Sequence, residues 1–199
     1  MIRPLRIAVA DDEPDIREFF ERYLPRLGHQ VASVAENGRQ LVEQCRESHP
    51  DLIITDIRMP GLDGVDAVGA IFREYEVPTI IVTGHADPQW MERAPPTGVF
   101  SFLLKPITER ELQPAIALAW RQWEQFKSLR QEATDLRQAL EDRKLIERAK
   151  GVVMRRLHVS ETEAFRRLRK FSSDHNLKLV MVAQKVISAE EIFCALDPE

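Results

Sequence analysis

Residues 52–64 read LIITDIRMPGLDG, and this stretch decides the fold class. The apolar run from Leu52 to Thr55 predicts a buried strand that ends at Asp56, and Gly64 opens a segment with helical apolar spacing. Four more apolar runs alternate with helical patterns, at residues 6–10, 31–35, 79–82 and 100–104. Such alternation is typical of a parallel sheet with helices on both faces. The sequence therefore predicts a five-stranded, doubly wound α/β domain.

Length and composition favour one ordinary domain followed by a smaller module. The chain has 199 residues, of which 44% are hydrophobic, so a sizeable core is available. Cys45 and Cys194 are its only cysteines, which argues against a disulfide scaffold or a zinc site. We find neither a signal-peptide pattern at the start nor an apolar run of membrane-spanning length. We expect a soluble, cytoplasmic protein.

A long helix is predicted after the α/β domain. Residues 108–111, TERE, form a capping box, and no strong helix breaker follows before Gly151. Apolar residues recur with coiled-coil spacing at 112, 116, 119, 123 and 126, and again in a shifted register at 129, 133, 136 and 140. We expect a coiled coil with a discontinuity over residues 108–143, and therefore a homodimer. The alternative is that the first half packs on the α/β domain and the second half on the C-terminal module.

The remaining chain predicts a small all-α module with three short helices and a basic charge. Residues 143–185 carry twelve basic and four acidic side chains, whereas the whole chain has a net charge of −4. A basic module on an acidic protein indicates a polyanion as partner. The alternative is a charged face that is merely solvated.

Polar side chains gather where the predicted strands end. Asp11 and Asp12 follow the first strand and Asp56 ends the third, so these carboxylates meet at the carboxyl edge of the sheet. Like charges about 4 Å apart repel by roughly 4 kcal/mol at an effective dielectric constant near 20, so the cluster needs a cation or shifted protonation. An all-oxygen ligand set suits Mg²⁺ with a phosphate as co-ligand. Thr83 and Lys105 end the fourth and fifth strands at the same edge.

Four motifs in order and spacing make this domain resemble the receiver domains of two-component response regulators. They are ADDE at 10–13, DIRMPGLDG at 56–64, VTG at 82–84 and LKP at 104–106. The resemblance covers about residues 4 to 125 and implies a flavodoxin-like fold. It also implies that Asp56 accepts a phosphoryl group from a sensor histidine kinase. The implied ligands of Mg²⁺ are Asp11, through a bound water, Asp12, Asp56 and the backbone carbonyl of Arg58.

The resemblance further assigns a switch. Lys105 would neutralise the phosphoryl group, Thr83 would hydrogen-bond to it, and Phe102 occupies the place of the family's switch aromatic. Hydrogen bonds to charged groups contribute roughly 1.5–3 kcal/mol each, and inverting a 1:99 population takes roughly 5.5 kcal/mol, so two such bonds nearly suffice. The alternative, an acidic edge with a merely paired lysine, leaves the other groups of the site unexplained.

One departure from the family pattern concerns the fourth helix. Pro95 and Pro96 fall where this helix should finish, and paired prolines cannot continue it. We therefore expect the face near Trp90 to be reshaped and the family's usual receiver dimer surface to be altered.

A basic stripe with a glycine at its centre marks the C-terminal module. Lys144, Arg148, Gly151 and Arg155 recur at positions i, i+4, i+7 and i+11. Glycine within a helix costs about 1 kcal/mol relative to alanine, which suggests that something approaches the backbone there. Either a polyphosphate chain or a neighbouring helix satisfies this argument.

Residues 146–154, IERAKGVVM, together with EAF at 163–165 and LR at 168–169, resemble the ANTAR family of RNA-binding antitermination domains. The resemblance covers about residues 140 to 190 and implies binding of paired RNA stem-loops by a dimer, which prevents a terminator hairpin. The sequence departs from the family pattern at residues 171–175. The residues expected to contact RNA are Lys144, Arg148, Lys150, Gly151, Arg155 and Arg169.

We thus expect a receiver domain at 1–125, a long helix at 108–143 and an output domain at 140–190. The leading hypothesis is a phosphorylation-controlled RNA-binding antiterminator. The alternatives are a DNA-binding transcription factor and a signalling adaptor that binds only protein. We do not expect an enzyme, because the residues support only self-catalysed phosphoryl transfer and slow hydrolysis at Asp56.

Overall fold

The computed structural model describes residues 3–84 and 98–196. The chain divides into two compact units, Met1–Lys127 and Ser128–Glu199. The sequence expectations for Trp90 and for the Pro95 and Pro96 pair concern residues outside the described ranges.

Five parallel strands form the sheet of the first unit, in the order β2-β1-β3-β4-β5. Their bounds agree with the predicted runs to within one residue at either end, so the predicted α/β fold is confirmed. The strands are β1 Arg6–Ala10, β2 Gln30–Ala35, β3 Leu52–Asp56, β4 Thr79–Thr83 and β5 Val99–Leu104.

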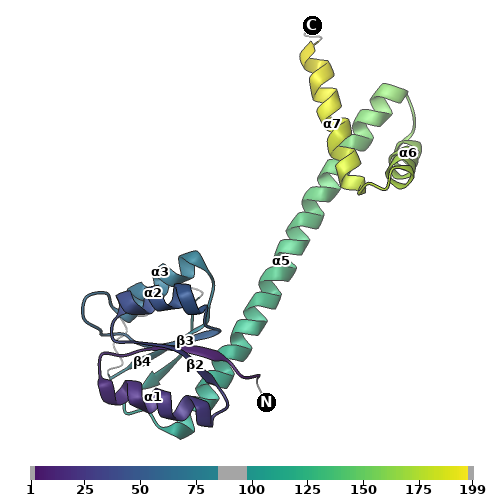
Figure 1. The fold of residues 1–199 in the computed structure, drawn as a ribbon. Coiled ribbons are helices and arrows are strands. Elements are labelled where there is room, and N and C mark those ends of the chain that lie inside the picture. Colours follow the sequence, from purple (N-terminus) through teal and green to yellow (C-terminus); the bar gives the residue numbers. More distant parts are fainter. Residues whose placement is uncertain (1–2, 85–97, 197–199) are drawn as a thin grey trace. The chain divides into compact units, whose positions relative to one another are not determined.

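Helices cover both faces of this sheet. Figure 1 shows α2 Gly38–Ser48 and α3 Gly64–Glu74 on one face, and α1 Pro14–Arg26 with the beginning of α5 Glu109–Leu157 on the other. Each face has its own apolar core, because the inner strands have buried side chains on both sides. The turns are fixed by caps: the side chain of Asn37 accepts a hydrogen bond from the amide of Gln40 at the start of α2.

The helix α5, Glu109–Leu157, is continuous over 49 residues. Its first apolar positions, including Leu112, Ile116 and Trp123, are buried in the core of the first unit. The predicted coiled-coil register is therefore wrong for residues 112–126, and the alternative of packing on the α/β domain holds for this half. In the second half Leu129 and Leu136 are 59% and 60% exposed.

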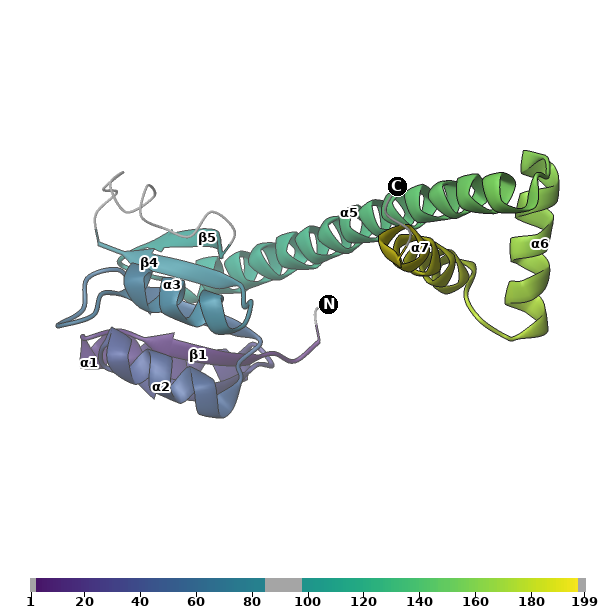
Figure 2. The same cartoon turned by 90° about the horizontal axis from the view of Figure 1, so that it is seen from above.

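The second unit contains the C-terminal part of α5, α6 Glu161–Asp174 and α7 Leu179–Leu196. The first of the three helices predicted for this module is thus the end of α5, since α5 continues without a break to Leu157 and Gly151 remains helical. Both α6 and α7 contribute to one small apolar core with α5 (Figure 2). The core residues are Ala149, Leu168, Val182, Ala183 and Ile187.

Helices in the described part of the chain are either too short or too polar to cross a lipid bilayer.

Candidate functional site

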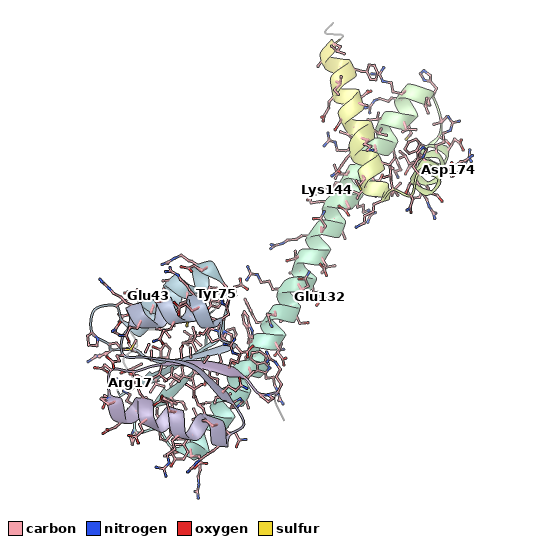
Figure 3. All side chains as sticks on the ribbon, viewed as in Figure 1. Arg17, Glu43, Tyr75, Glu132, Lys144 and Asp174 are labelled. Carbon is pink, nitrogen blue, oxygen red and sulfur yellow. The ribbon has the colours of Figure 1, made fainter. Side chains whose placement is uncertain are left out.

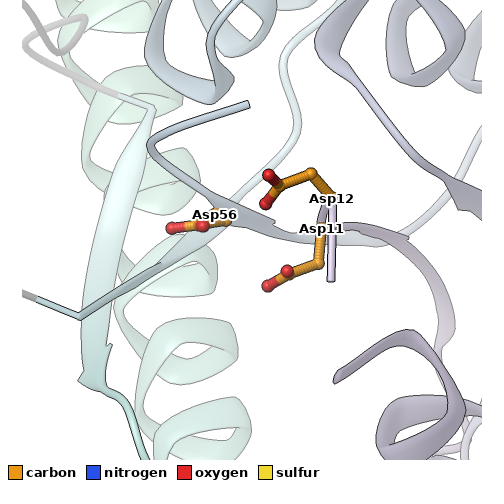
Figure 4. A group of neighbouring side chains, drawn as sticks. All are labelled: Asp11, Asp12 and Asp56. Carbon is orange, nitrogen blue, oxygen red and sulfur yellow. The ribbon is translucent and has the colours of Figure 1, made fainter. Parts of the chain in front are cut away.

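Three carboxylates converge at the carboxyl edge of the sheet, as the strand pattern predicts. Asp11 and Asp12 follow β1, Asp56 ends the neighbouring strand β3, and one oxygen of each lies within 4.8 Å of one of each of the others. Figure 4 shows the three side chains grouped at this edge. Asp11 and Asp56 are buried, whereas Asp12 is exposed, so the cluster opens to solvent on the side of Asp12.

The ammonium group of Lys105 lies between the carboxylates. Its Nζ is 3.1 Å from Asp56 Oδ2, 2.9 Å from Asp11 Oδ2 and 2.7 Å from Glu13 Oε1. Burial by itself lowers the pKa of Lys105, but the contacts with Glu13, Asp11 and Asp56 raise this pKa above its ordinary value. The pKa of Asp11 is raised, because burial outweighs the opposing effect of Lys105. One cation is therefore shared among several anions.

The donor set fits a magnesium ion. The buried Asp11 Oδ2 accepts no hydrogen bond of good geometry, although Lys105 Nζ is close to it. One oxygen of Asp56 accepts a hydrogen bond from the amide of Ile57 at 2.7 Å, which fixes the carboxylate plane. A hard cation that prefers oxygen ligands satisfies such an orphan oxygen. The residues present would hold it with Asp11, Asp12, Asp56 and the carbonyl of Arg58.

The two other residues of the predicted switch differ in their surroundings. Thr83 is buried at the end of β4, and its carbonyl accepts a hydrogen bond from the amide of Lys105 at 2.8 Å, so it belongs to the same edge as the cluster. Phe102 is 56% exposed on β5 and pairs in register with Ile81. The structure thus brings Thr83 to the pocket and presents Phe102 on the outer part of β5.

Sequence reasoning missed Arg17, which supports the loop that carries the two aspartates. Its guanidinium donates to the carbonyl oxygens of Asp11 and Asp12 at 2.9 and 3.0 Å and pairs with Glu36 at 3.2 Å. Figure 3 labels Arg17 on α1. The sequence does carry a signal for this role: Arg17 lies in the first turns of α1, five positions after Asp12. A long basic side chain at this position can reach back to the preceding loop.

Gly64 is required next to the pocket for a steric reason. A Cβ atom at this position would lie 1.8 Å from the carbonyl oxygen of Asp56, so only glycine permits this approach of α3 to the end of β3. Its amide donates to the carbonyl of Ile57 at 2.9 Å. The glycine therefore fixes the backbone next to Asp56.

In the second unit, the structure buries one of the residues predicted to contact RNA. Lys150 is only 8% exposed, and its Nζ lies 2.7 Å from carboxylate oxygens of both Glu147 and Glu161. These two hydrogen bonds raise the pKa of Lys150. Its ammonium also lies 5.7 Å from the centre of the Phe165 ring. Lys150 therefore ties the end of α5 to the start of α6.

Most of the predicted basic stripe is also paired within the chain. Lys144, labelled in Figure 3, lies 2.7 Å from Glu141 on the same helix. Two acidic residues of α7 face the stripe: Glu191 pairs with Arg148 at 3.5 Å and Glu190 with Arg155 at 4.0 Å. Arg169 has no ion pair within the described ranges.

Gly151 lies in the middle of the stripe with room around it. A Cβ atom there would meet only the guanidinium of Arg155, at an ordinary contact distance of 3.6 Å. No other described helix of this chain therefore requires a glycine at this position, and the interpretation that it admits a neighbouring helix of the same chain is wrong.

Comparison with known proteins identifies the first unit. The family model of the response regulator receiver domain matches residues 7–117. The chain belongs to the response regulators. A second family model, that of the ANTAR domain, matches residues 134–187 of this response regulator. The predicted combination of receiver and ANTAR domains is thereby confirmed.

Relatives of this response regulator include one that matches nearly the whole chain. The transcriptional regulatory protein PdtaR of Mycobacterium tuberculosis is 33% identical over 184 residues, which cover 92% of this chain and 90% of PdtaR. The probable transcriptional regulatory protein NarL of the same organism is 35% identical over 115 residues, or 56% of this chain and 53% of NarL. Among solved structures, the receiver domain of that NarL aligns with a TM-score of 0.53 at 31% identity, covering 58% of this chain and 95% of the domain.

Proposed function

We propose that this two-component response regulator accepts a phosphoryl group on Asp56 from a sensor histidine kinase and then binds RNA stem-loops to prevent transcription termination. The observation that supports this proposal is the complete acidic pocket, Asp11, Asp12 and Asp56 with Lys105, on the same chain as an ANTAR domain. As a protein whose only chemistry is at its own aspartate, it would act as a phosphoacceptor rather than as an enzyme.

The chemistry at Asp56 follows from the arrangement of charges. A carboxylate oxygen of Asp56 attacks the phosphorus of the donor, the P–O bond forms, and the P–N bond of the phosphohistidine breaks so that the imidazole leaves. A bound Mg²⁺ ion would neutralise charge on the phosphoryl oxygens. Lys105 Nζ, 3.1 Å from Asp56 Oδ2, exchanges a carboxylate for a phosphoryl oxygen without a long movement.

The signal leaves the pocket through Thr83, which ends β4, and Lys105, which follows the neighbouring strand β5. A charge-assisted hydrogen bond from each to the phosphoryl group contributes roughly 1.5–3 kcal/mol, enough together to shift a two-state equilibrium substantially. The element that responds is α5, which follows β5.

A homodimer is part of the proposal. Leu129, Ala133, Leu136 and Leu140 keep 4,3,4 spacing on α5, and the three leucines are each about 60% exposed. A second copy of this segment would bury the leucines in a short coiled coil and place two ANTAR domains together. Figure 3 shows Glu132, between the first two of these positions, projecting from the helix.

The test is phosphorylation followed by RNA binding. Full-length protein is treated with phosphoramidate and Mg²⁺, and intact mass spectrometry counts the phosphoryl groups; Asp56→Asn is the matched control. We expect one phosphoryl group on the wild type and none on the variant. The phosphorylated protein should retain RNA from a pool of double stem-loops with randomised loops more strongly than the unphosphorylated protein.

Two results would contradict the proposal. If Asp56→Asn were phosphorylated to the same extent as the wild type, Asp56 would not be the phosphorylated residue. Stronger retention of duplex DNA than of the RNA pool would favour a DNA-binding regulator.

A further inference from the structure

The cations of the second unit fall into a paired and an unpaired group. On α5, Arg148 and Arg155 form ion pairs with glutamates of α7. Arg156 does the same, and its Nε lies 2.7 Å from a carboxylate oxygen of Glu190. Lys150 is buried between two carboxylates. An anionic ligand at this stripe meets carboxylates beside the cations, and their negative charge opposes its approach.

Two hollows of the second unit show the contrast directly. The hollow beside Gly151, with a volume of about 280 Å³, is lined by Arg148 and Arg155 but also by Glu190 and Glu191, so its formal charges cancel. The other hollow lies at the corner between α6 and α7 and has a volume of about 430 Å³. It is lined by Arg169, Ser172, Ser173, Asn176, Leu177, Lys178 and Leu179, with two cations and no carboxylate.

The cations of this corner hollow are unengaged by acidic partners. Neither Arg169 nor Lys178 has an ion pair with any residue in the ranges 3–84 and 98–196. The guanidinium of Arg169 lies 5.9 Å from the centre of the Phe165 ring, which supports the side chain and leaves its N–H groups available. Both side chains are exposed and can reach a ligand from opposite ends of the turn.

The turn between them is held in one conformation. Ser172 Oγ donates to the carbonyl of Leu177 at 2.6 Å, and the amide of Leu177 donates to the carbonyl of Ser172 at 2.9 Å. His175 stacks on Phe171 with ring centroids 4.0 Å apart. Asn176 adopts a left-handed conformation with φ of 53°. A fixed turn sets the backbone positions of Arg169 and Lys178 before a ligand arrives, which limits the ordering cost of binding to that of the two side chains.

We propose that the hollow at the α6–α7 corner is the phosphate-binding site for the RNA backbone, with Arg169 and Lys178 as its charged contacts. This site rests on the proposed RNA-binding function. It places the main contact with RNA at the α6–α7 corner instead of on the basic stripe of α5. Hydroxyl and amide groups of Ser173 and Asn176 add neutral hydrogen-bonding partners for phosphate and sugar oxygens. Lys150 and the stripe instead hold the three helices together.

Two variants that remove equal charge test this site. The corner variant carries both Arg169→Gln and Lys178→Gln, and the stripe variant carries both Arg148→Gln and Arg155→Gln. Both are compared with the wild type as phosphorylated full-length proteins. Fluorescence anisotropy measures their binding to the pool of double stem-loop RNAs at several salt concentrations. We expect the corner variant to lose on the order of tenfold in affinity and about 1.4–1.8 in the slope of log K against log salt, because two phosphate contacts are removed. The stripe variant should lose less than about threefold.

Controls separate folding from binding. Circular dichroism should show the wild-type helix content in both variants, since the substituted side chains are exposed. The charge-preserving Arg169→Lys, Lys178→Arg protein should retain most of the affinity.

Three outcomes would overturn the site. Equal loss in the corner and stripe variants, or a larger loss in the stripe variant, would overturn the corner site alone and leave RNA binding standing. No RNA retained by the phosphorylated wild type would overturn the proposed function together with the site. A preference of the wild type for duplex DNA, lost in the corner variant, would keep the hollow as a phosphate site but overturn its assignment to RNA.

Discussion

Two lysines of this chain have similar partners and different positions. Lys105 and Lys150 are each held by at least two carboxylates, and contacts with carboxylates raise the pKa of both. Lys105 stands at the open edge of a sheet beside Asp56, so an incoming phosphoryl group can replace one of its contacts. Lys150 stands between α5 and α6, where any replacement would separate two helices. Their surroundings, rather than the residue type, distinguish the proposed signalling contact of Lys105 from the structural contact of Lys150.

Arg17 is expected to set the affinity of the pocket for Mg²⁺. Arg17→Gln removes the hydrogen bonds to the backbone carbonyls of Asp11 and Asp12, so the loop that carries both carboxylates is held less firmly. Groups that orient metal ligands typically change metal affinity about 10–100-fold, so the Mg²⁺ concentration for half-maximal phosphorylation should rise at least about tenfold. The measurement is the rate of phosphorylation by phosphoramidate against Mg²⁺ concentration.

Arg22→Gln, on the exposed part of the same helix, is the matched control and should leave this concentration unchanged. Arg17→Lys should recover part of the affinity. A lower maximal rate at an unchanged Mg²⁺ requirement would contradict a role in positioning the aspartates.

His29 makes the stability of the receiver domain depend on pH. Its ring is 8% exposed, Nδ1 accepts a hydrogen bond from the amide of Leu5 at 3.2 Å, and burial lowers its pKa. The folded protein thus keeps His29 neutral, whereas the unfolded chain takes up a proton near pH 6.5. This contribution to stability is complete above about pH 6.5 and is lost as the pH falls through the lower pKa of the folded state.

Urea unfolding followed by tryptophan fluorescence measures this dependence. The three tryptophans of the chain all fall in Met1–Lys127, so they report on the receiver unit. The free energy of unfolding should decrease more steeply below about pH 6.5 for the wild type than for His29→Asn, which keeps an acceptor without titrating. Parallel curves for the two proteins would show that His29 is not responsible.

At the scale of elements, α5 combines two environments in one continuous helix. Leu112 and Ile116 have no exposed surface, because they complete a face of the sheet. Leu136 and Leu140 have the same apolar spacing and are about 60% exposed. Apolar spacing alone does not say which partner covers a helix face, since a domain core and a second helix demand the same pattern.

Leu136→Lys is expected to weaken the proposed dimer. The side chain is exposed in the monomer, so the substitution costs the fold little, but it places a charge in the seam of a coiled coil. Light scattering on the phosphorylated protein should show a dimer for the wild type and a monomer for the variant at the same concentration.

Leu118→Lys serves as its control, because Leu118 is 50% exposed on the same helix but within the first unit. This variant should keep the mass of the wild type. If the dimer persisted in Leu136→Lys and dissociated in Leu118→Lys, the dimer interface would lie on the receiver unit.

At the scale of the whole molecule, two cores of different size belong to one chain. The receiver unit has buried side chains on both faces of a five-stranded sheet, whereas the ANTAR unit has five buried apolar residues in its main cluster. Ion pairs such as Arg156 with Glu190 and Lys150 with Glu161 supplement this small core. We infer that the two units differ in stability and that the output unit is the weaker one.

Ile187→Ala should separate the two unfolding transitions. Ile187 is 7% exposed in the core of the output unit, and truncation of a buried isoleucine costs about 2–5 kcal/mol. Helix content measured by circular dichroism should decrease at lower urea concentration than in the wild type, while the tryptophan transition stays in place. A shift of both transitions by the same amount would mean that the units unfold together.

The sequence by itself determined the elements of the receiver domain and the composition of its pocket. Five strand positions agree within a residue with the apolar runs, and the aspartates at 11, 12 and 56 are found together because parallel strands end at one edge. Local sequence suffices here, since a strand and the residue that follows it are fixed by a few consecutive side chains. The family model for the ANTAR domain likewise matches where the local motifs predicted it.

Only the tertiary structure decided which charges are available. The spacing of Arg148 and Arg155 predicted an open basic stripe, but α7 crosses α5 so that Glu191 and Glu190 pair with it from more than thirty residues away. Lys150 is buried where the start of α6 meets α5 and Glu161 pairs with it, and Glu13 joins Lys105 across 92 positions. Helical periodicity fixes the face on which a side chain lies, while packing between distant segments determines whether that face meets a partner, a carboxylate or solvent.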